Sequence, residues 1–177
     1  MKLCIVSDTH GRTDELHAAA LIAGDVDVFL HAGDETADAA WLASYMKIPV
    51  VGVAGNWDKP SVDYPLERIV SVDDVPLFLA HGHRLQVTES LQPLVARAES
   101  MGARIAVYGH THVLHAGVHD DVLVVNPGSL ALPRGGTKGS FVRLTSTAVP
   151  GGFVRYLVEH LTTTAEIISK FEFVGKK

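Results

Sequence analysis

Cysteine is nearly absent from this sequence. Its one thiol belongs to Cys4, so no disulfide can form within the chain, and a fold held together by disulfides is excluded. Cys4 stands in a short apolar run, which is more typical of a small core residue than of a nucleophile. The 177 residues are enough to bury a core without cross-links, and we expect a single domain over residues 1–177.

Basic runs and long apolar runs are missing as well. The formal net charge is -5 and lysines and arginines do not cluster, which excludes a broad surface for nucleic acid or anionic membranes. This charge count still permits a small, local cationic site. No apolar run approaches the roughly 20 residues that span a bilayer. The first apolar run reaches Asp8 before a signal-peptide core could form, so we expect a cytoplasmic protein.

Histidine, by contrast, is abundant. The chain has ten histidines against two tryptophans, and six of the ten lie between residues 81 and 119. Histidine is the commonest metal ligand in proteins, so this clustering points to a metal site. Hydrophobic residues make up 47% of the chain and charged residues 20%, an ordinary globular balance that excludes a disordered protein.

The hydrophobic pattern predicts an α/β fold. In the N-terminal half, strands over 2–7, 26–32 and 49–54 alternate with helices over 13–23 and 37–46, which implies parallel pairing. A hairpin over 68–80 follows. The next predicted helix, 89–101, has Thr88 as its cap and Gly102 at its end, and a strand over 104–108 comes after it.

The last third of the sequence reads as β structure alone. Predicted strands cover 113–119, 122–126, 140–146, 153–160 and 165–174. Taken with the N-terminal half, the pattern indicates two packed β-sheets that form a sandwich flanked by helices.

Several predicted strands end at a glycine that has a potential metal-binding side chain next to it. Ligands of open α/β sheets bind beyond the carboxyl ends of the strands, so we expect five loops to deliver these side chains to one rim. We also expect His110 and His112 to face the same way on an extended segment. The donors are Asp8, His10, Asp34, Asn56, His81, His110 and His112.

These seven side chains offer only oxygen and imidazole donors. Such a set suits a hydrolytic Mn, Fe, Co, Ni or Zn site better than a structural zinc site, which prefers thiolates. Seven donors exceed the needs of one tetrahedral ion. They fit two ions about 3.5–4 Å apart that share a carboxylate and a bridging water.

The ordered motifs resemble those of the calcineurin-like metallophosphoesterase superfamily. They are Asp-x-His at Asp8, Gly-Asp at Asp34, Gly-Asn-x-Asp at Asn56, a histidine at His81, and Gly-His-x-His at His110. The short chain, His81-Gly82-His83 and Asn126-Pro127-Gly128-Ser129 resemble its small bacterial and archaeal phosphodiesterase branch. The resemblance runs from residue 2 to about residue 134, and it implies the four-layer αββα fold of that family.

The resemblance also implies roles for these residues. Asp8, His10 and His112 would hold one metal, Asn56, His81 and His110 the other, and Asp34 would bridge both. Asp34, Asn56 and His81 would act in catalysis through the water that the two metals share. The expected ions are two divalent cations, Mn²⁺ first, with Ni²⁺, Fe²⁺, Zn²⁺, Co²⁺ and Mg²⁺ as alternatives. The expected reaction is the hydrolysis of a small phosphodiester or nucleotide-like substrate.

The sequence departs from the family at one position. Many relatives have a histidine, thought to assist the leaving group, where this chain has Trp57. Tryptophan cannot act as a general acid, whose help is typically worth about 10²–10⁴ in rate. We therefore expect a preference for good leaving groups unless His83 supplies the proton, and the indole of Trp57 could instead stack on a nucleobase or aryl group. Arg134 and Lys138 lie in a loop over 133–138 that we interpret as solvated, although they could contact a substrate phosphate.

Other functions remain open at this point. A protein-assembly scaffold of the same fold is the rival from another class, and the filled set of seven donor positions favours the enzyme over it. Among enzymes, a phosphomonoesterase and a dinucleoside polyphosphate hydrolase are the alternatives. The resembled branch is typically oligomeric, so we expect a homo-oligomer. His17, His31, His115, His119 and His160 fit no ligand role, and we interpret them as surface or packing residues.

Overall fold

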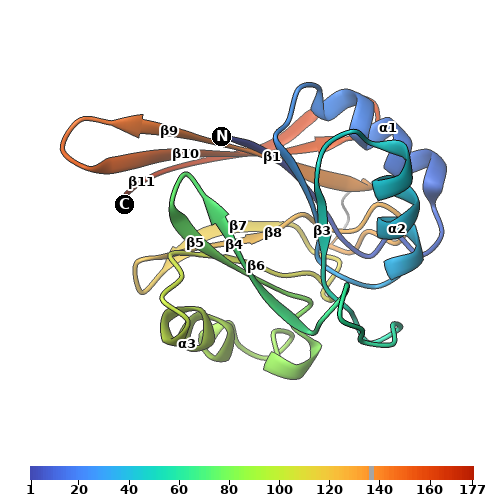
Figure 1. Cartoon of the computed structure of the whole chain (residues 1–177), viewed down its shortest axis with the longest axis horizontal. Coiled ribbons are helices and arrows are strands. Elements are labelled where there is room, and N and C mark those ends of the chain that lie inside the picture. Colours follow the sequence, from blue (N-terminus) through green and yellow to red (C-terminus); the bar gives the residue numbers. More distant parts are fainter. Residues whose placement is uncertain (136–137) are drawn as a thin grey trace.

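The computed structural model describes residues 1–135 and 138–177, and it consists of two β-sheets packed face to face with helices on the outside (Figure 1). One sheet has six strands in the order β11-β10-β9-β1-β2-β3, and the other has five in the order β4-β5-β6-β8-β7. This arrangement confirms the predicted sandwich flanked by helices.

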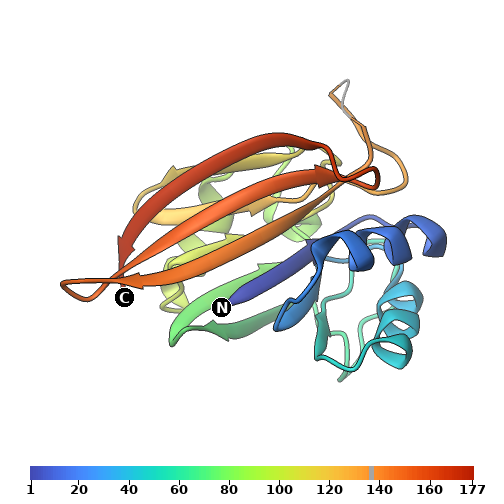
Figure 2. The same cartoon turned by 90° about the horizontal axis from the view of Figure 1, so that it is seen from above.

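The first sheet is built around the N-terminal strands. β1 pairs in parallel with β2, and β2 with β3, as the alternation of strands and helices predicted. Helices α1 and α2 lie together against one face of this sheet (Figures 1 and 2). The bounds are β1 (Lys2–Val6), α1 (Thr13–Ala23), β2 (Val28–His31), α2 (Thr36–Tyr45) and β3 (Val50–Gly52).

The side-chain alternation of β1 shows why the sheets stack. Leu3 and Ile5 are fully buried in the core between the two sheets, whereas Cys4 and Val6 are fully buried under the helices. Successive side chains of a strand point to opposite faces, so a strand covered on both sides has to be apolar throughout. Cys4 is thus the core residue that the sequence indicated, and burial raises the pKa of its thiol far above the ordinary value.

The second sheet repeats this pattern with one helix outside it. Leu77 and Leu79 of β5 face the core between the sheets, while Phe78 and Ala80 pack against the side of α3. The elements are β4 (Glu67–Val72), β5 (Val75–Ala80), the short 3₁₀ helix η1 (His83–Leu85), α3 (Gln92–Ser100), β6 (Ile105–Val107), β7 (His115–His119) and β8 (Val122–Asn126). The layers from one side to the other are helices, sheet, sheet and helix.

Helix α3 begins three residues later than predicted. Thr88 does not cap it; Leu91 is the N-cap, and the backbone N–H of Gln92 donates to the Ser90 hydroxyl at 3.1 Å. The segment before it coils into η1 and further turns instead, and a proline in the first turn of α3 fits a helix start there. The predicted end at residue 101 is correct to within one residue: α3 ends at Ser100, Met101 is its C-cap, and Gly102 follows with a positive φ of 71°.

The three C-terminal strands extend the first sheet; two of them are longer than predicted, and the last is shifted by two residues. β9 (Ser140–Val149) and β10 (Phe153–Thr162) pair without interruption up to the Val149–Phe153 turn, and β11 (Ile167–Lys176) adds the edge. β9 runs past its predicted end at residue 146 because Thr147 and Ala148, whose side chains are exposed, weaken the apolar signal near that turn. Among residues 1–135 and 138–177, the helices are all too short or too polar to cross a bilayer.

Candidate metal centre

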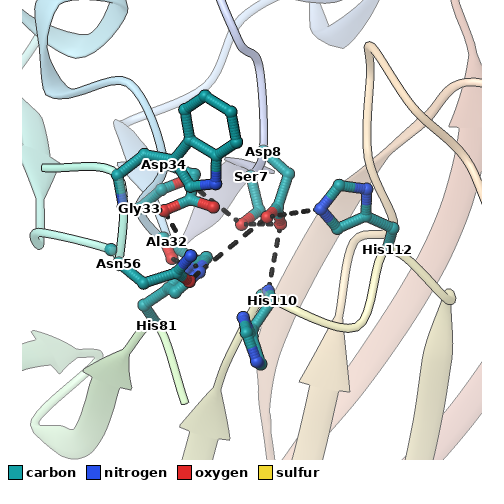
Figure 3. A network of polar contacts seen from close by, with 12 residues as sticks. Ser7, Asp8, Ala32, Gly33, Asp34, Asn56, His81, His110 and His112 are labelled. Carbon is teal, nitrogen blue, oxygen red and sulfur yellow. Dashed lines mark hydrogen bonds and ion pairs between the residues drawn. The ribbon is translucent and has the colours of Figure 1, made fainter. Parts of the chain in front are cut away.

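The seven predicted ligands meet at one rim of the sandwich, and Figure 3 shows six of them, all but His10. The loops after β1, β2 and β3 of the six-stranded sheet bring Asp8 and His10, Asp34, and Asn56. The loops after β5 and β6 of the five-stranded sheet bring the three remaining histidines, His81, His110 and His112. The site therefore lies where the carboxyl ends of strands from both sheets converge, as in other α/β proteins.

Four of these side chains form a tight cluster. Ligand atoms of Asp8, His10, Asp34 and His112 all lie within 4.8 Å of one another. Two of the atoms are buried without a hydrogen bond: Asp8 Oδ1, which lies 3.1 Å from His112 Nε2, and His10 Nε2. Buried polar atoms are normally satisfied, because leaving one unpaired costs about 1–3 kcal/mol. Converging lone pairs of this kind fit a divalent metal ion.

The other three predicted ligands join the cluster through His81. Its Nε2 lies 3.3 Å from Asp34 Oδ1 and 3.1 Å from Asn56 Oδ1, while its Nδ1 donates to the carbonyl of Ala32 at 2.7 Å. The ring of His110 meets that of His81 edge-on, with centroids 5.2 Å apart. All seven donors thus share one location, and their division between two ions stays a prediction.

The electrostatics of the site show how strongly its groups are coupled. Burial alone would lower the pKa of His81, but the hydrogen bond with Asp34 and the charges of Asp8 and Asp34 raise it above the ordinary value. Burial would raise the pKa of Asp34, yet the hydrogen bond and charge of His81 hold it below its usual range. Two carboxylates thus draw positive charge onto a neighbouring imidazole, which is the attraction a metal cation would also feel.

The backbone at the ligands is unusual. Five of the seven have positive φ: Asp8, His10, Asp34, His110 and His112, at 53°, 43°, 60°, 66° and 59°. Left-handed conformations are rare for residues other than glycine, and they concentrate at functional sites. The prediction that His110 and His112 lie on an extended segment is therefore wrong. The chain leaves β6 at Val107 and turns, and the two left-handed residues aim both rings at the site.

Asp58 fixes the loop that carries Asp34, a role that the sequence did not reveal. Its Oδ1 accepts hydrogen bonds from the backbone N–H of Glu35 and from both the N–H and the hydroxyl of Thr36, at 2.7–3.1 Å. Its Oδ2 accepts from the N–H of Asp34 at 3.0 Å and of Gly55 at 2.8 Å. Asp58 thus satisfies the free N–H groups at the start of α2 from 22 residues away. Its position after Asn56 and Trp57 was the one available signal.

The turn over residues 126–129 fastens the other loops. The amide of Asn126 donates to the carbonyl of Gly109 at 2.9 Å and to the hydroxyl of Thr111 at 3.1 Å. The hydroxyl of Ser129 donates to the carbonyl of Asp8 at 2.7 Å. The sequence of this segment resembles that of the family, and it indicated no ligand role for these residues. The contacts show that it holds the Asp8 loop and the His110–His112 loop in register.

Two glycines allow the ligand loops to approach closely. A Cβ at Gly55 would lie 2.8 Å from the carboxyl carbon of Asp34, and one at Gly109 would lie 2.8 Å from Asp8 Oδ2. Neither glycine has a positive φ, so the requirement is for space and not for backbone freedom. This explains why glycine stands directly before each of Asn56 and His110.

His31, at the end of β2, also contacts two of these loops. Its Nδ1 accepts the N–H of Gly33 at 3.2 Å, and its Nε2 pairs with the hydroxyl of Thr9 at 3.0 Å. Nδ1 as acceptor makes Nε2 the protonated nitrogen of a neutral ring. Burial lowers the pKa of His31 to about 4, against the opposing charges of Asp38 and Asp8. His31 is the packing residue that we expected, and it links the Asp8 loop to the Asp34 loop.

The residues proposed for substrate contact line two different cavities. Trp57 is 75% exposed and lines a cavity of about 280 Å³ together with several of the ligands. Arg134 also lines this cavity, so it belongs to the site and not only to a solvated loop; residues 136–137 of that loop lie outside the described residues. His83 lines a neighbouring cavity beside η1, with its ring 5.4 Å from that of His81, and burial lowers its pKa.

Comparison with known proteins identifies the family. Residues 1–148 match the family model of the calcineurin-like phosphoesterase superfamily domain. The chain belongs to this superfamily. It is similar to the probable metallophosphoesterase YsnB of Bacillus subtilis, with 32% identity over 146 residues that cover 82% of this chain and 84% of the relative. It is also similar to the phosphodiesterase MJ0936 of Methanocaldococcus jannaschii, with 31% identity over 153 residues, 72% of this chain and 83% of the relative.

Solved structures share the fold of this chain. A predicted phosphoesterase of Streptococcus pneumoniae superimposes with a TM-score of 0.78 at 25% identity and covers 98% of this chain and 97% of its own. A Vps29 variant from Entamoeba histolytica gives a TM-score of 0.75 at 18% identity, over 98% and 99%. This family uses divalent metals, and the cluster at Asp8 and Asp34 is the corresponding candidate site.

Proposed function

We propose that this phosphoesterase is a metal-dependent phosphodiesterase. The observation that carries the proposal is the convergence of seven oxygen and imidazole donors at one rim, where Asp8 Oδ1, at 3.1 Å from His112 Nε2, and His10 Nε2 are buried without a hydrogen bond. The name of the relative MJ0936, a phosphodiesterase, supports the diester as substrate. We propose Mn²⁺ as the first of the divalent ions to test, because a set without thiolates suits hard to borderline cations.

The residues of the chain divide the work. Asp8, His10 and His112 would hold one ion, Asn56, His81 and His110 a second, and Asp34 both. Bound divalent ions supply a water of lowered pKa and positive charge for the phosphate oxygens. Asn56 contributes a neutral oxygen, so only Asp8 and Asp34 offset the charge of two ions. With two ions bound, the site would keep a net positive charge that attracts a phosphate within a chain of net charge -5.

Metal add-back tests this function. The purified protein is stripped with a chelator, reloaded with Mn²⁺, Ni²⁺, Fe²⁺, Zn²⁺, Co²⁺ or Mg²⁺ singly, and assayed on a bis-aryl phosphodiester and on the matching aryl phosphomonoester. We expect turnover of the diester to disappear with the metal and to return on reloading. Preference for the monoester, or for a dinucleoside polyphosphate, would assign one of the two alternative reactions instead.

Asp34→Asn is the variant that links this turnover to the site. The amide oxygen can still accept the N–H of Trp57, which donates to Asp34 Oδ1 at 3.1 Å, so we expect the fold to survive. Loss of the charge should lower metal affinity and turnover at least a hundredfold. Asp63→Asn, an exposed loop carboxylate, is the matched control. Full turnover by Asp34→Asn would refute the site, and a wild-type chain that binds no divalent ion would favour the scaffold.

The exposed position of Trp57 leads to a second expectation for this reaction. An indole cannot donate a proton as an acid, so departure of the alcohol has to depend on its own basicity. Rates measured along a series of aryl and alkyl phosphodiesters should fall steeply as the pKa of the leaving alcohol rises. Trp57→His should flatten that dependence and help the poorest leaving groups most. A flat dependence in the unmodified protein would contradict this expectation.

A further inference from the structure

The indole of Trp57 is exposed although it is one of the largest apolar groups in the chain. Its relative exposure is 75%, and it stands at the rim of the 280 Å³ cavity beside the ligands. Trp41, the second tryptophan, is part of α2, is partly buried and packs against the core between the helices and the first sheet. A large apolar side chain that is exposed beside a functional cavity indicates a surface that contacts a ligand.

The fold does not need this ring. The structural contact of Trp57 comes from its backbone N–H, which donates to Asp34 Oδ1 at 3.1 Å, and nearly any residue could supply it. The ring meets His10 edge-on, with the centroids 5.3 Å apart and the planes at 72°. An edge contact leaves the faces of an indole available for stacking.

Leu132 provides a second apolar surface at the same cavity. It is 56% exposed, and its carbonyl accepts a hydrogen bond from His112 Nδ1 at 2.8 Å. The rings of His10 and His112 lie 5.5 Å apart, so contacts run from Trp57 through this histidine pair to Leu132. The side chains of Trp57 and Leu132 thus line the same cavity and flank His10 and His112. Thr88, which also lines this cavity, is polar.

We propose that Trp57 and Leu132 form a subsite for the aromatic arm of the substrate, a nucleobase or another planar aryl group. This proposal rests on the proposed function, because it places the phosphate at the ligand cluster and the arm on the His10–His112 side. Base stacking on an exposed aromatic side chain tolerates different bases, since each has a π-face. The substrate class is therefore a nucleoside or aryl phosphodiester, with no base preference of more than a few fold.

Fluorescence tests binding apart from turnover. In a Trp41→Phe background Trp57 is the one remaining tryptophan, so its emission reports on the subsite alone. The metal-loaded protein is titrated with adenosine monophosphate and, separately, with methyl phosphate. We expect saturable quenching by the nucleotide and none by methyl phosphate. Equal responses to the two ligands, or no response to either, would overturn the proposal.

Kinetics test the same subsite without the Trp41 change. The substrates are a nucleoside and a butyl phosphodiester, each with trifluoroethanol as a good leaving group that is not aromatic. Trp57→Ala should raise KM for the nucleoside diester roughly tenfold, with kcat nearly unchanged and the butyl diester unaffected. Trp57→Phe should restore most of the loss. Val62→Ala, which removes a 94% exposed apolar side chain away from the cavity, is the matched control.

The outcomes separate the two proposals. If diesters are hydrolysed but Trp57→Ala changes KM for both substrates alike, the subsite is refuted and the phosphodiesterase stands. If no diester is hydrolysed by any metal-loaded form while the nucleotide still quenches Trp57, the proposed reaction fails and the aromatic subsite stands.

Discussion

Five of the predicted ligands hold a left-handed backbone that L-amino acids seldom adopt, and each such position costs about 1–3 kcal/mol. A domain has a total stability of only about 5–15 kcal/mol, so this strain has to be offset by neighbouring contacts. Hydrogen bonds from Ser129 to Asp8 and from the Asp34 loop to Asp58 supply them. The side chains that make these hydrogen bonds therefore help to hold the predicted ligands in place.

At the scale of single residues, His31 makes the free energy of unfolding depend on pH. Burial lowers the pKa of His31 to about 4, whereas the unfolded chain has the ordinary value of 6.5. Between these values the unfolded state binds a proton that the folded state does not. The free energy of unfolding should therefore fall as the pH drops from 6.5 towards 4, by about 3 kcal/mol from this residue.

Urea unfolding at pH 7 and pH 5 checks this expectation, in chelator so that metal release does not contribute. His31→Gln keeps hydrogen-bonding groups but cannot titrate, so its stability should change less between the two pH values. His17→Gln, which alters an exposed contact with Tyr45, should keep the full dependence. The same loss of stability in His31→Gln as in the wild type would exclude this origin.

At the scale of elements, Asp58 joins the end of β3 to the start of α2. It accepts five hydrogen bonds, four of them from backbone N–H groups. Asp58→Ala should lower the free energy of unfolding by about 2–4 kcal/mol, because those groups lose their acceptor. Asp58→Asn should lose about half as much, since one oxygen remains.

Chemical denaturation of these variants, with Asp63→Ala as an exposed control, measures the effect. Because Asp58 positions Asp34, metal affinity measured by calorimetry should also fall about 10- to 100-fold in Asp58→Ala. A variant that loses stability but keeps its metal affinity would restrict Asp58 to a structural role.

Elements also show where pattern recognition from sequence works. α1 and β8 have the predicted bounds, because apolar spacing and flanking turn residues define them locally. The start of α3 and the conformation of His110 and His112 were predicted wrongly. Both errors lie in irregular loops, where contacts with other elements and not the local pattern decide the backbone.

At the scale of the whole molecule, the ligands come from both sheets. Asp8, Asp34 and Asn56 follow strands of the six-stranded sheet, and His81, His110 and His112 follow strands of the five-stranded sheet. A metal ion held by residues from both sets would link the two halves of the sandwich at one rim. Ligands that bind only the folded state stabilise it by mass action, by about 2.7 kcal/mol at a hundredfold excess over Kd.

Thermal unfolding with and without divalent metal checks this consequence. Loading should raise the Tm by several degrees, because 1 kcal/mol corresponds to about 2–4 °C in a chain of this size. Asp34→Asn should show little of this increase. An equal rise in Asp34→Asn would mean that the stabilising ion binds elsewhere. The expected homo-oligomer stays a prediction, which light scattering can test on the same samples.

The sequence by itself determined the donor types, their order along the chain and their positions after strands, because these depend on local patterns of apolar and turn residues. It also marked Trp57 as a departure from the family. Only the tertiary structure decided which donors share one space, that Asp58 and Asn126 hold their loops, and that the indole stays in water. Those features arise where the two sheets pack together. Packing brings together residues that are far apart in the sequence, and the local sequence pattern does not indicate such contacts.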